Sequence, residues 1–173
     1  MCLAAWSVAQ HPGFPWVIAT NRDEYFDRAA APLAWWRPQP DAAPILGGRD
    51  LLAGGTWLGL SAEGGFALVT NVRGTQAADA TLASRGELVT ASLAIGADDQ
   101  VALAALASVP RNGFNLLRAD LRSADGIWVT NRPFDQRRFG SGMHGLSNAA
   151  LDTPWPKVRQ LKQRLAAAVV GAD

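Results

Sequence analysis

Residues 2–21 read CLAAWSVAQHPGFPWVIATN, and this stretch indicates how the fold begins. An apolar run covers residues 2–9, the turn-forming sequence HPGFP follows at 11–15, and a second apolar run covers 16–20. Two apolar runs joined by a turn rich in proline and glycine are typical of a β-hairpin. We therefore predict an N-terminal hairpin whose first strand begins at Cys2.

The rest of the chain alternates short apolar runs with helical periodicity. Two further hairpins are predicted at 57–61 with 66–72 and at 114–121 with 127–130, and helices at 85–95, 98–108 and 154–170. Several prolines and glycines in residues 32–55 predict a long, ordered loop. Hairpins interrupted by helices indicate an α+β fold with antiparallel sheets, in one domain over residues 1–173.

Helix boundaries are predicted from capping residues. Asp98 is placed to cap the second helix and to supply an acidic first turn. In the last helix, Asp152 or Thr153 is expected to cap, Pro154 to occupy the first turn, and Gly171 to end the helix. The amphipathic pattern of this last helix predicts that it covers a sheet.

Composition excludes several classes of protein. The formal net charge is +1 and no basic cluster exceeds Arg137–Arg138, which argues against nucleic-acid binding. One cysteine cannot form a disulfide framework, and two distant histidines give no metal-ligand spacing. The first 20 residues lack the features of a signal peptide, and no apolar run is long enough for a transmembrane segment. We therefore expect a cytoplasmic protein.

Cys2 is the only cysteine of the chain and follows the initiator Met1 directly. Removal of Met1 would place a free α-amino group beside the thiol. Their reference pKa values are about 7.7–8.0 for the amine and about 8.5 for the thiol, so one residue would hold a nucleophile and a proton acceptor. An isolated cysteine is more often a small buried hydrophobic residue, and both interpretations stay open at this point.

Four segments of similar sequence end in asparagine, at Asn21, Asn71, Asn131 and Asn148. Asparagine at a strand end is often a turn residue and nothing more. Neighbouring strands that end at one rim of a sheet could instead direct several amide N–H groups at one point. Such donors would suit a developing oxyanion.

The first of these segments continues as Asn21-Arg22-Asp23-Glu24, a dense polar cluster after an apolar strand. A charged turn or a cap would explain this cluster without any function. With Cys2 on the adjacent strand, Asp23 could orient a freed α-amino group, and Arg22 could favour the thiolate. Because side chains alternate along a strand, Arg22 should point away if Asp23 faces Cys2, unless the strand ends or bulges there, so we favour Asp23 over Arg22.

Several short motifs occur in order along most of the chain. They are MCL at 1–3, NRDE at 21–24, GGTWLG at 54–59, TNVR at 70–73, SRG at 84–86, LSN at 146–148 and LDTPWPKV at 151–158. In these motifs the sequence resembles the NRDE family, also called the transport and Golgi organization protein 2 family.

This family in turn resembles the cysteine-type N-terminal nucleophile hydrolases, such as bile salt hydrolase and penicillin V acylase. The resemblance implies an αββα sandwich and a cysteine amidohydrolase that cleaves an acyl amide through a thioester. It implies Cys2 as nucleophile and base and Asp23 as partner of the freed amine. Asn71 and Asn148 would be candidates for the oxyanion hole and for support of the amine or substrate.

Two departures from those acylases bear on this expectation. They carry an arginine three residues before the aspartate, where this chain has Thr20, and a later arginine beyond its end. Members of the family generally continue well past the helix at 154–170, so the resemblance implies a C-terminally truncated domain here, whose exposed sheet edge would favour a homodimer. Apolar side chains for an acyl pocket would come from Trp35, Trp36 and Trp57.

The alternative function is a non-catalytic carrier of haem or another hydrophobic ligand on the same fold. No cofactor is expected for the hydrolase. In a carrier, Cys2, His11 or His144 would be the candidate axial ligands of haem.

Overall fold

The computed structural model describes residues 2–74, 78–96 and 98–171. Strands and helices alternate in the order expected for an α+β domain. They are β1 (Leu3–Val8), β2 (Trp16–Asn21), β3 (Ala30–Trp36), β4 (Ile45–Asp50), β5 (Leu58–Ser61), β6 (Gly65–Asn71), α1 (Gly86–Leu93), α2 (Gln100–Ser108), β7 (Phe114–Asp120), β8 (Gly126–Asn131), β9 (Phe134–Phe139), β10 (Gly142–Leu146) and α3 (Pro156–Val170).

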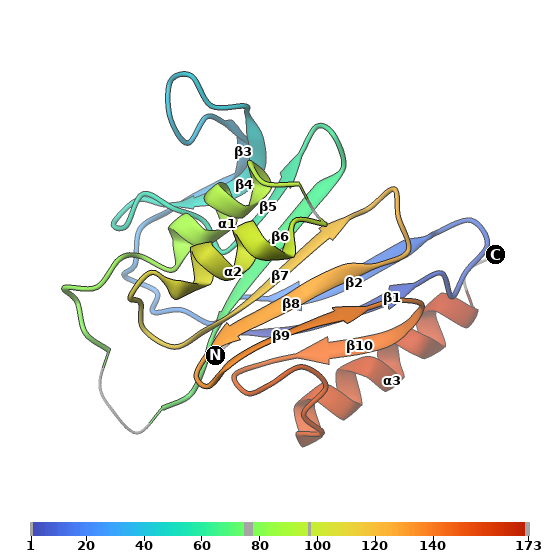
Figure 1. Ribbon diagram of the computed structural model, residues 1–173. Helices are drawn as coiled ribbons and strands as arrows, with labels where there is room; N and C mark the ends of the chain where they lie inside the picture. The colour runs from blue at the N-terminus through green and yellow to red at the C-terminus, as the bar shows by residue number, and fades with distance from the viewer. Residues whose placement is uncertain (1, 75–77, 97, 172–173) are drawn as a thin grey trace.

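The strands form two antiparallel sheets (Figure 1). The small sheet has the order β10-β1-β2, so the last strand pairs with the first. The large sheet runs from β3 to β9 in chain order. This second sheet is a meander, in which each strand pairs with its neighbour in sequence through a short connection or, between β6 and β7, through the two helices.

The two sheets pack face to face around one apolar layer. Alternate side chains of β1, namely Ala4, Trp6 and Val8, are buried against Leu68 of β6 and Trp128 of β8. Because side chains alternate along a strand, Ala5 of β1 faces the other way and contacts α3. The strands near the centre of each sheet are therefore covered on both faces, which explains why β1 and β6 read as nearly continuous apolar runs.

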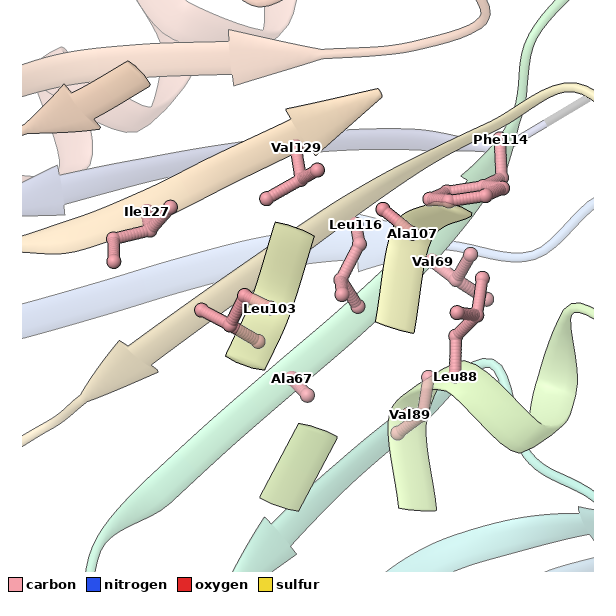
Figure 2. Close-up of a cluster of buried hydrophobic side chains, with 10 residues drawn as sticks. All are labelled: Ala67, Val69, Leu88, Val89, Leu103, Ala107, Phe114, Leu116, Ile127 and Val129. Atoms are coloured by element: carbon pink, nitrogen blue, oxygen red, sulfur yellow. The ribbon is translucent and has the colours of Figure 1, made fainter. Parts of the chain in front are cut away.

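Helices cover the outer face of each sheet, which gives four layers in the order helix, sheet, sheet, helix. Figure 2 shows the layer between the large sheet and helices α1 and α2, where Leu88 and Leu103 lie over Val69 and Leu116. The third helix, α3, packs on the small sheet through Leu165 and Val169 (Figure 1). The prediction that this last helix covers a sheet is confirmed.

The three predicted hairpins are present. In the first, Leu3 pairs with Asn21 and Trp6 with Ile18. The second joins β5 to β6 and the third joins β7 to β8, both antiparallel. Local turn chemistry was sufficient to predict them, because each turn directly connects the two strands that pair.

The prediction of a long loop over residues 32–55 is wrong. This region forms the β3–β4 hairpin, in which Trp36 pairs with Ile45. Pro32 is tolerated because β3 is an edge strand of the large sheet, where one side needs no backbone donor. The register also shifts between Ala31 and Ala34, so the strand is irregular beside the proline.

Two helix starts also differ from prediction. The side chain of Asp99, and not of Asp98, accepts a hydrogen bond from Ala102 N and caps α2. The cap of α3 is Trp155, and the helix begins at Pro156, so Pro154 lies before the helix. The predicted cap Asp152 is used elsewhere, because its carboxylate binds groups of β10 and the middle of α3.

The sequence did not predict β9 and β10. Strand β9 is a polar edge strand, FDQRRF, and β10 is glycine-rich, so neither has a clear apolar pattern. Helix α3, at 15 residues, is the longest helix in the described residues, and none of these helices has the length and apolar character needed to cross a membrane.

Candidate functional site

Cys2 lies directly before β1 and is buried, with 9% of its surface exposed. Its backbone is held by the segment that follows β10, since the Ser147 hydroxyl donates to the Cys2 carbonyl oxygen over 2.8 Å. The same segment crosses to β6, where the Thr70 hydroxyl donates to the Ser147 carbonyl oxygen over 2.6 Å. The strand pairing of the small sheet thus places Cys2 beside the end of β6 in the large sheet.

A cavity of about 520 Å³ opens at this point. Cys2 lines it together with residues from five other parts of the chain. They include Arg22, Asp23, Glu24, Arg28, Asp50, Trp57, Asn71, Asp79 and Arg85. Four of the five predicted site residues, namely Cys2, Arg22, Asp23 and Asn71, therefore lie around one cavity.

Asp23 is a polar partner of the Cys2 thiol. Its backbone N–H donates a hydrogen bond to the Cys2 sulfur. Its carboxylate accepts a hydrogen bond from the Asn21 side chain. The Asp23 backbone and side chain are therefore held close to Cys2 by the end of the first hairpin.

Burial raises the pKa of the Cys2 thiol above its ordinary value. The Asp23 N–H and the positive charge of Arg22 act in the opposite direction, but they do not outweigh burial. The negative charge of Asp23 adds to the increase. The residues around Cys2 therefore do not by themselves make the thiol a thiolate at neutral pH.

The condition under which Arg22 would point away from Cys2, a strand that continues through residues 22 and 23, is not met. Strand β2 ends at Asn21, so the alternation of side chains stops there and both Arg22 and Asp23 line the cavity. The Arg22 guanidinium lies 3.1 Å from a carboxylate oxygen of Glu24 and 3.3 Å from one of Asp50.

Arg28 and Asp50 complete this group of charges, and sequence reasoning did not find either. Arg28 Nε donates to Asp50 Oδ2 over 2.7 Å, and Asp50 Oδ1 accepts from the backbone N–H groups of Leu52 and Ala53. Burial acts to raise the pKa of Asp50, but these donors together lower it. The ion pairs fix residues 22–28 against the end of β4, and no sequence pattern links these distant segments.

Arg85, in the SRG motif at 84–86, is a further cavity residue for which no role was predicted. It precedes α1, and its Nη1 donates to the Gly113 carbonyl oxygen over 3.3 Å. Burial lowers the pKa of Arg85, while interactions with Cys2 and Glu24 act to raise it. An arginine stays protonated at neutral pH, so Arg85 places a second positive charge near Cys2 in addition to Arg22.

Asn71 and Asn148 are close together but differ in surroundings. Asn71 lines the cavity, and its side chain has no hydrogen-bond partner among the described residues. Asn148 is buried, and its Nδ2 donates to the Asn71 carbonyl oxygen over 2.9 Å. Its Oδ1 lies 3.1 Å from the Ser147 hydroxyl and 3.4 Å from the Lys157 ammonium. The geometry therefore leaves the Asn71 amide available to a ligand and gives Asn148 the role of holding the Asn71 backbone.

The predicted rim of four asparagines forms in part. Asn21, through Asp23, and Asn148, through Asn71, are connected to the Cys2 cavity. Asn131 instead accepts from the Phe114 backbone N–H and donates to a backbone carbonyl before β7. Its amide thus stabilises a connection of the large sheet.

Only some of the tryptophan and histidine side chains that were predicted to have a role lie at the Cys2 cavity. Trp57 lines the Cys2 cavity, whereas Trp35 and Trp36 lie on the edge strand β3 and are not among the lining residues. Both ring nitrogens of His144 are engaged, at 3.1 Å from a carboxylate oxygen of Asp152 and at 2.9 Å from the Gly140 carbonyl oxygen. Among the residues with described positions, no three His, Cys, Asp or Glu side chains form a cluster that could hold a metal ion.

Comparison with known proteins gives consistent matches over most of the chain. The family model described as Transport and Golgi organisation 2 matches residues 1–172. The chain is 38% identical over 162 residues to the human Transport and Golgi organization protein 2 homolog, covering 88% of this chain and 57% of that protein. It is 28% identical over 190 residues to Transport and Golgi organization protein 2 of Drosophila melanogaster, covering 98% and 65% respectively. The chain thus spans less than two thirds of the length of these relatives.

Proposed function

The chain belongs to the Transport and Golgi organisation 2 family, and we propose that it acts as an N-terminal-cysteine amidohydrolase on an acyl amide. The observation that carries this proposal is the position of Cys2 in a polar cavity, with the Asp23 N–H bonded to its sulfur. The helix–sheet–sheet–helix layers agree with the N-terminal nucleophile hydrolase fold that the sequence resemblance implies.

The proposed nucleophile depends on removal of Met1, which lies outside the described residues. Because burial raises the pKa of the Cys2 thiol, the thiol is a poor nucleophile until a base is placed beside it. Removal of Met1 would convert the amide nitrogen of Cys2 into an α-amine with a pKa of about 7.7–8.0. This amine would accept the thiol proton, and the Asp23 carboxylate would orient the resulting ammonium.

The reaction would proceed through a thioester. The Cys2 sulfur attacks the amide carbonyl carbon, and the Asn71 amide donates to the oxyanion of the tetrahedral intermediate. The α-ammonium gives its proton to the departing amine as the C–N bond breaks. Water then attacks the thioester, and the acid product leaves as the thiol regains a proton.

Arg22 and Arg85 would favour the thiolate by charge, and Asn148 would act as a positioning residue for Asn71. The substrate would be a small acyl amide with polar groups, because charged side chains of both signs form much of the cavity and Trp57 is the one tryptophan among its lining residues. This differs from the apolar pocket of three tryptophans that the sequence suggested.

The proposal is tested by intact mass and by the rate of alkylation of the native protein near neutral pH. We expect loss of Met1 and rapid addition of one alkyl group, slowed several-fold in Asp23→Asn. Asp27→Asn is the matched control, because Asp27 is exposed, close in sequence and not a cavity residue. Retained Met1, or labelling of Cys2 only after unfolding, would contradict the proposal.

Turnover of acyl amides gives the second test. Cys2→Ala should abolish hydrolysis, and Asn71→Ala should lower kcat by about 10²–10³ if its amide stabilises the oxyanion. Hydrolysis that persists in Cys2→Ala would assign the activity to another group.

The carrier function remains the alternative proposal. To bind haem iron through one ring nitrogen, His144 would have to give up its hydrogen bond to Asp152 or to Gly140, which makes it a poor candidate ligand. A saturable shift of the Soret band on titration with haemin, lost in His11→Ala or Cys2→Ala, would support a haem carrier. An unsaturable titration would argue against it.

A further inference from the structure

A second cavity, of about 460 Å³, lies next to the Cys2 cavity. The two are separated by the contact between Asn71, which lines the first, and Asn148, which lines the second. The walls of this second cavity come from the residues after β6, from strands β8 and β9 with the turn between them, and from the segment before α3. We call it the arginine cavity, because Arg73, Arg132 and Arg137 line it.

Positive charge is concentrated in the arginine cavity. Its lining holds three arginines and one carboxylate, Asp135, which leaves a formal charge of +2 where the whole chain carries +1. Asp135 is paired with Arg137 over 2.5 Å. Lys157 adds a cation nearby, since its ammonium lies 3.4 Å from Asn148 Oδ1.

Two of the three guanidinium groups are held over aromatic rings. Arg73 lies 5.7 Å from the centroid of the Trp155 ring, and Arg137 lies 5.6 Å from that of Trp128. Trp128 is fully buried, and its indole N–H is bound to Asn115, so this ring is a fixed support. Arg132 makes no hydrogen bond or ion pair with the part of the chain that the structure describes.

We propose that the arginine cavity binds a small organic phosphate monoester. The planar guanidinium presents paired N–H donors that match the oxygens of a phosphate group, and three such groups around one cavity suit a dianion. The net charge of the lining is equal and opposite to that of a phosphate monoester at neutral pH.

The size and walls of the cavity indicate an organic group on the phosphate. The volume is within the range of small-molecule sites and exceeds what a phosphate group alone would fill. Apolar surface is supplied by Val72, Pro133, Ala149 and Trp155, which could contact a compact apolar body. The site differs from the Cys2 cavity in its lining residues, and its occupation does not depend on any reaction at Cys2.

The test is isothermal titration of the full chain with phenyl phosphate, with phenyl sulfate and inorganic phosphate as comparison ligands. We expect one saturable site for phenyl phosphate, with affinity at least about tenfold above that for phenyl sulfate, which carries one charge fewer. Inorganic phosphate should also bind more weakly, because it lacks the apolar body. No saturable binding, or equal affinity for all three ligands, would overturn the proposal.

Arg132→Gln locates the binding. This exposed side chain has no described polar partner to lose, so the variant should unfold at the wild-type temperature and bind phenyl phosphate about tenfold or more weakly. Arg164→Gln, an exposed position on α3 outside the cavity, is the matched control and should bind as the wild type does. Unchanged affinity in Arg132→Gln would place the site elsewhere. Cys2→Ala should bind normally, which separates this proposal from the proposed hydrolase.

Discussion

We expect Asn115 to be the polar side chain that contributes most to holding the two sheets together. It lies on β7, is fully buried, and accepts a hydrogen bond from the Trp128 indole N–H over 3.1 Å. Its amide group donates to Thr70 Oγ1 over 3.1 Å and to the Ala149 carbonyl oxygen over 3.0 Å. The perturbation we consider is Asn115→Ala, which removes these three contacts and a longer one, of 3.4 Å, to the Ser147 carbonyl oxygen.

The expected loss of stability follows from the number of these contacts. Each contributes about 1 kcal/mol net, and the Trp128 N–H would be left in a dry interior without an acceptor, which costs a further 1–3 kcal/mol or so. We therefore expect the free energy of unfolding to fall by about 4–6 kcal/mol. This is a large part of the roughly 5–15 kcal/mol that holds a typical domain folded.

The assay is equilibrium unfolding in urea, checked for reversibility and compared with Asn112→Ala. Asn112 also makes two hydrogen bonds, to the backbone of Asp79, but both are exposed to solvent. The control should therefore lose less than about 1 kcal/mol. A loss in Asn115→Ala no greater than that of the control would refute the argument that the buried network joins the two sheets.

Three further predictions concern other parts of the molecule. Gly55→Ala should destabilise the fold by about 1–3 kcal/mol in urea unfolding, because a Cβ there would lie 2.6 Å from the backbone of Gly86, whereas Gly96→Ala, with open space around it, should be neutral. Burial acts to raise the pKa of Asp152, but its imidazole and ammonium partners lower this pKa overall. The contribution of Asp152 to stability should therefore be present above pH 4 or so and be lost as the pH falls further. Asp152→Asn should reduce the dependence of stability on pH in this acid range. In protein that retains Met1, alkylation of Cys2 should still accelerate with pH up to about 9, since burial raises the pKa of the thiol, and a plateau below pH 8 or so would be inconsistent with that burial.

Local sequence signals predicted elements whose partners are adjacent in the chain. The turn at 11–15 was sufficient for the first hairpin, and the apolar face of α3 for its position on a sheet. Local signals did not predict the elements whose structure depends on a partner distant in sequence. Strand β3 contains Pro32 and looks like a loop until its place at a sheet edge is known, and β10 is a strand because β1 lies beside it.

The residues of the candidate site likewise include some that the sequence could identify and some that it could not. Cys2, Arg22, Asp23 and Asn71 could be named from their residue types and their places at strand ends, and the structure places all four around one cavity. The sequence could not identify three other lining residues, Arg28, Asp50 and Arg85, because the residue type alone does not show which distant groups an arginine or aspartate will contact. Asn148 was named as a candidate donor, yet its amide is bound to the backbone of Asn71.

By itself, the sequence determined the antiparallel α+β character of the chain, its family, and the position of its one cysteine at residue 2. These follow from alternation, turn residues and motifs, which act over a few residues. Only the tertiary structure decided that β10 returns to β1 and that the segment after it, through Ser147 and Asn148, connects Cys2 to the end of β6. Packing of two sheets brings together residues about 145 positions apart, and no local preference encodes which distant groups will share a cavity.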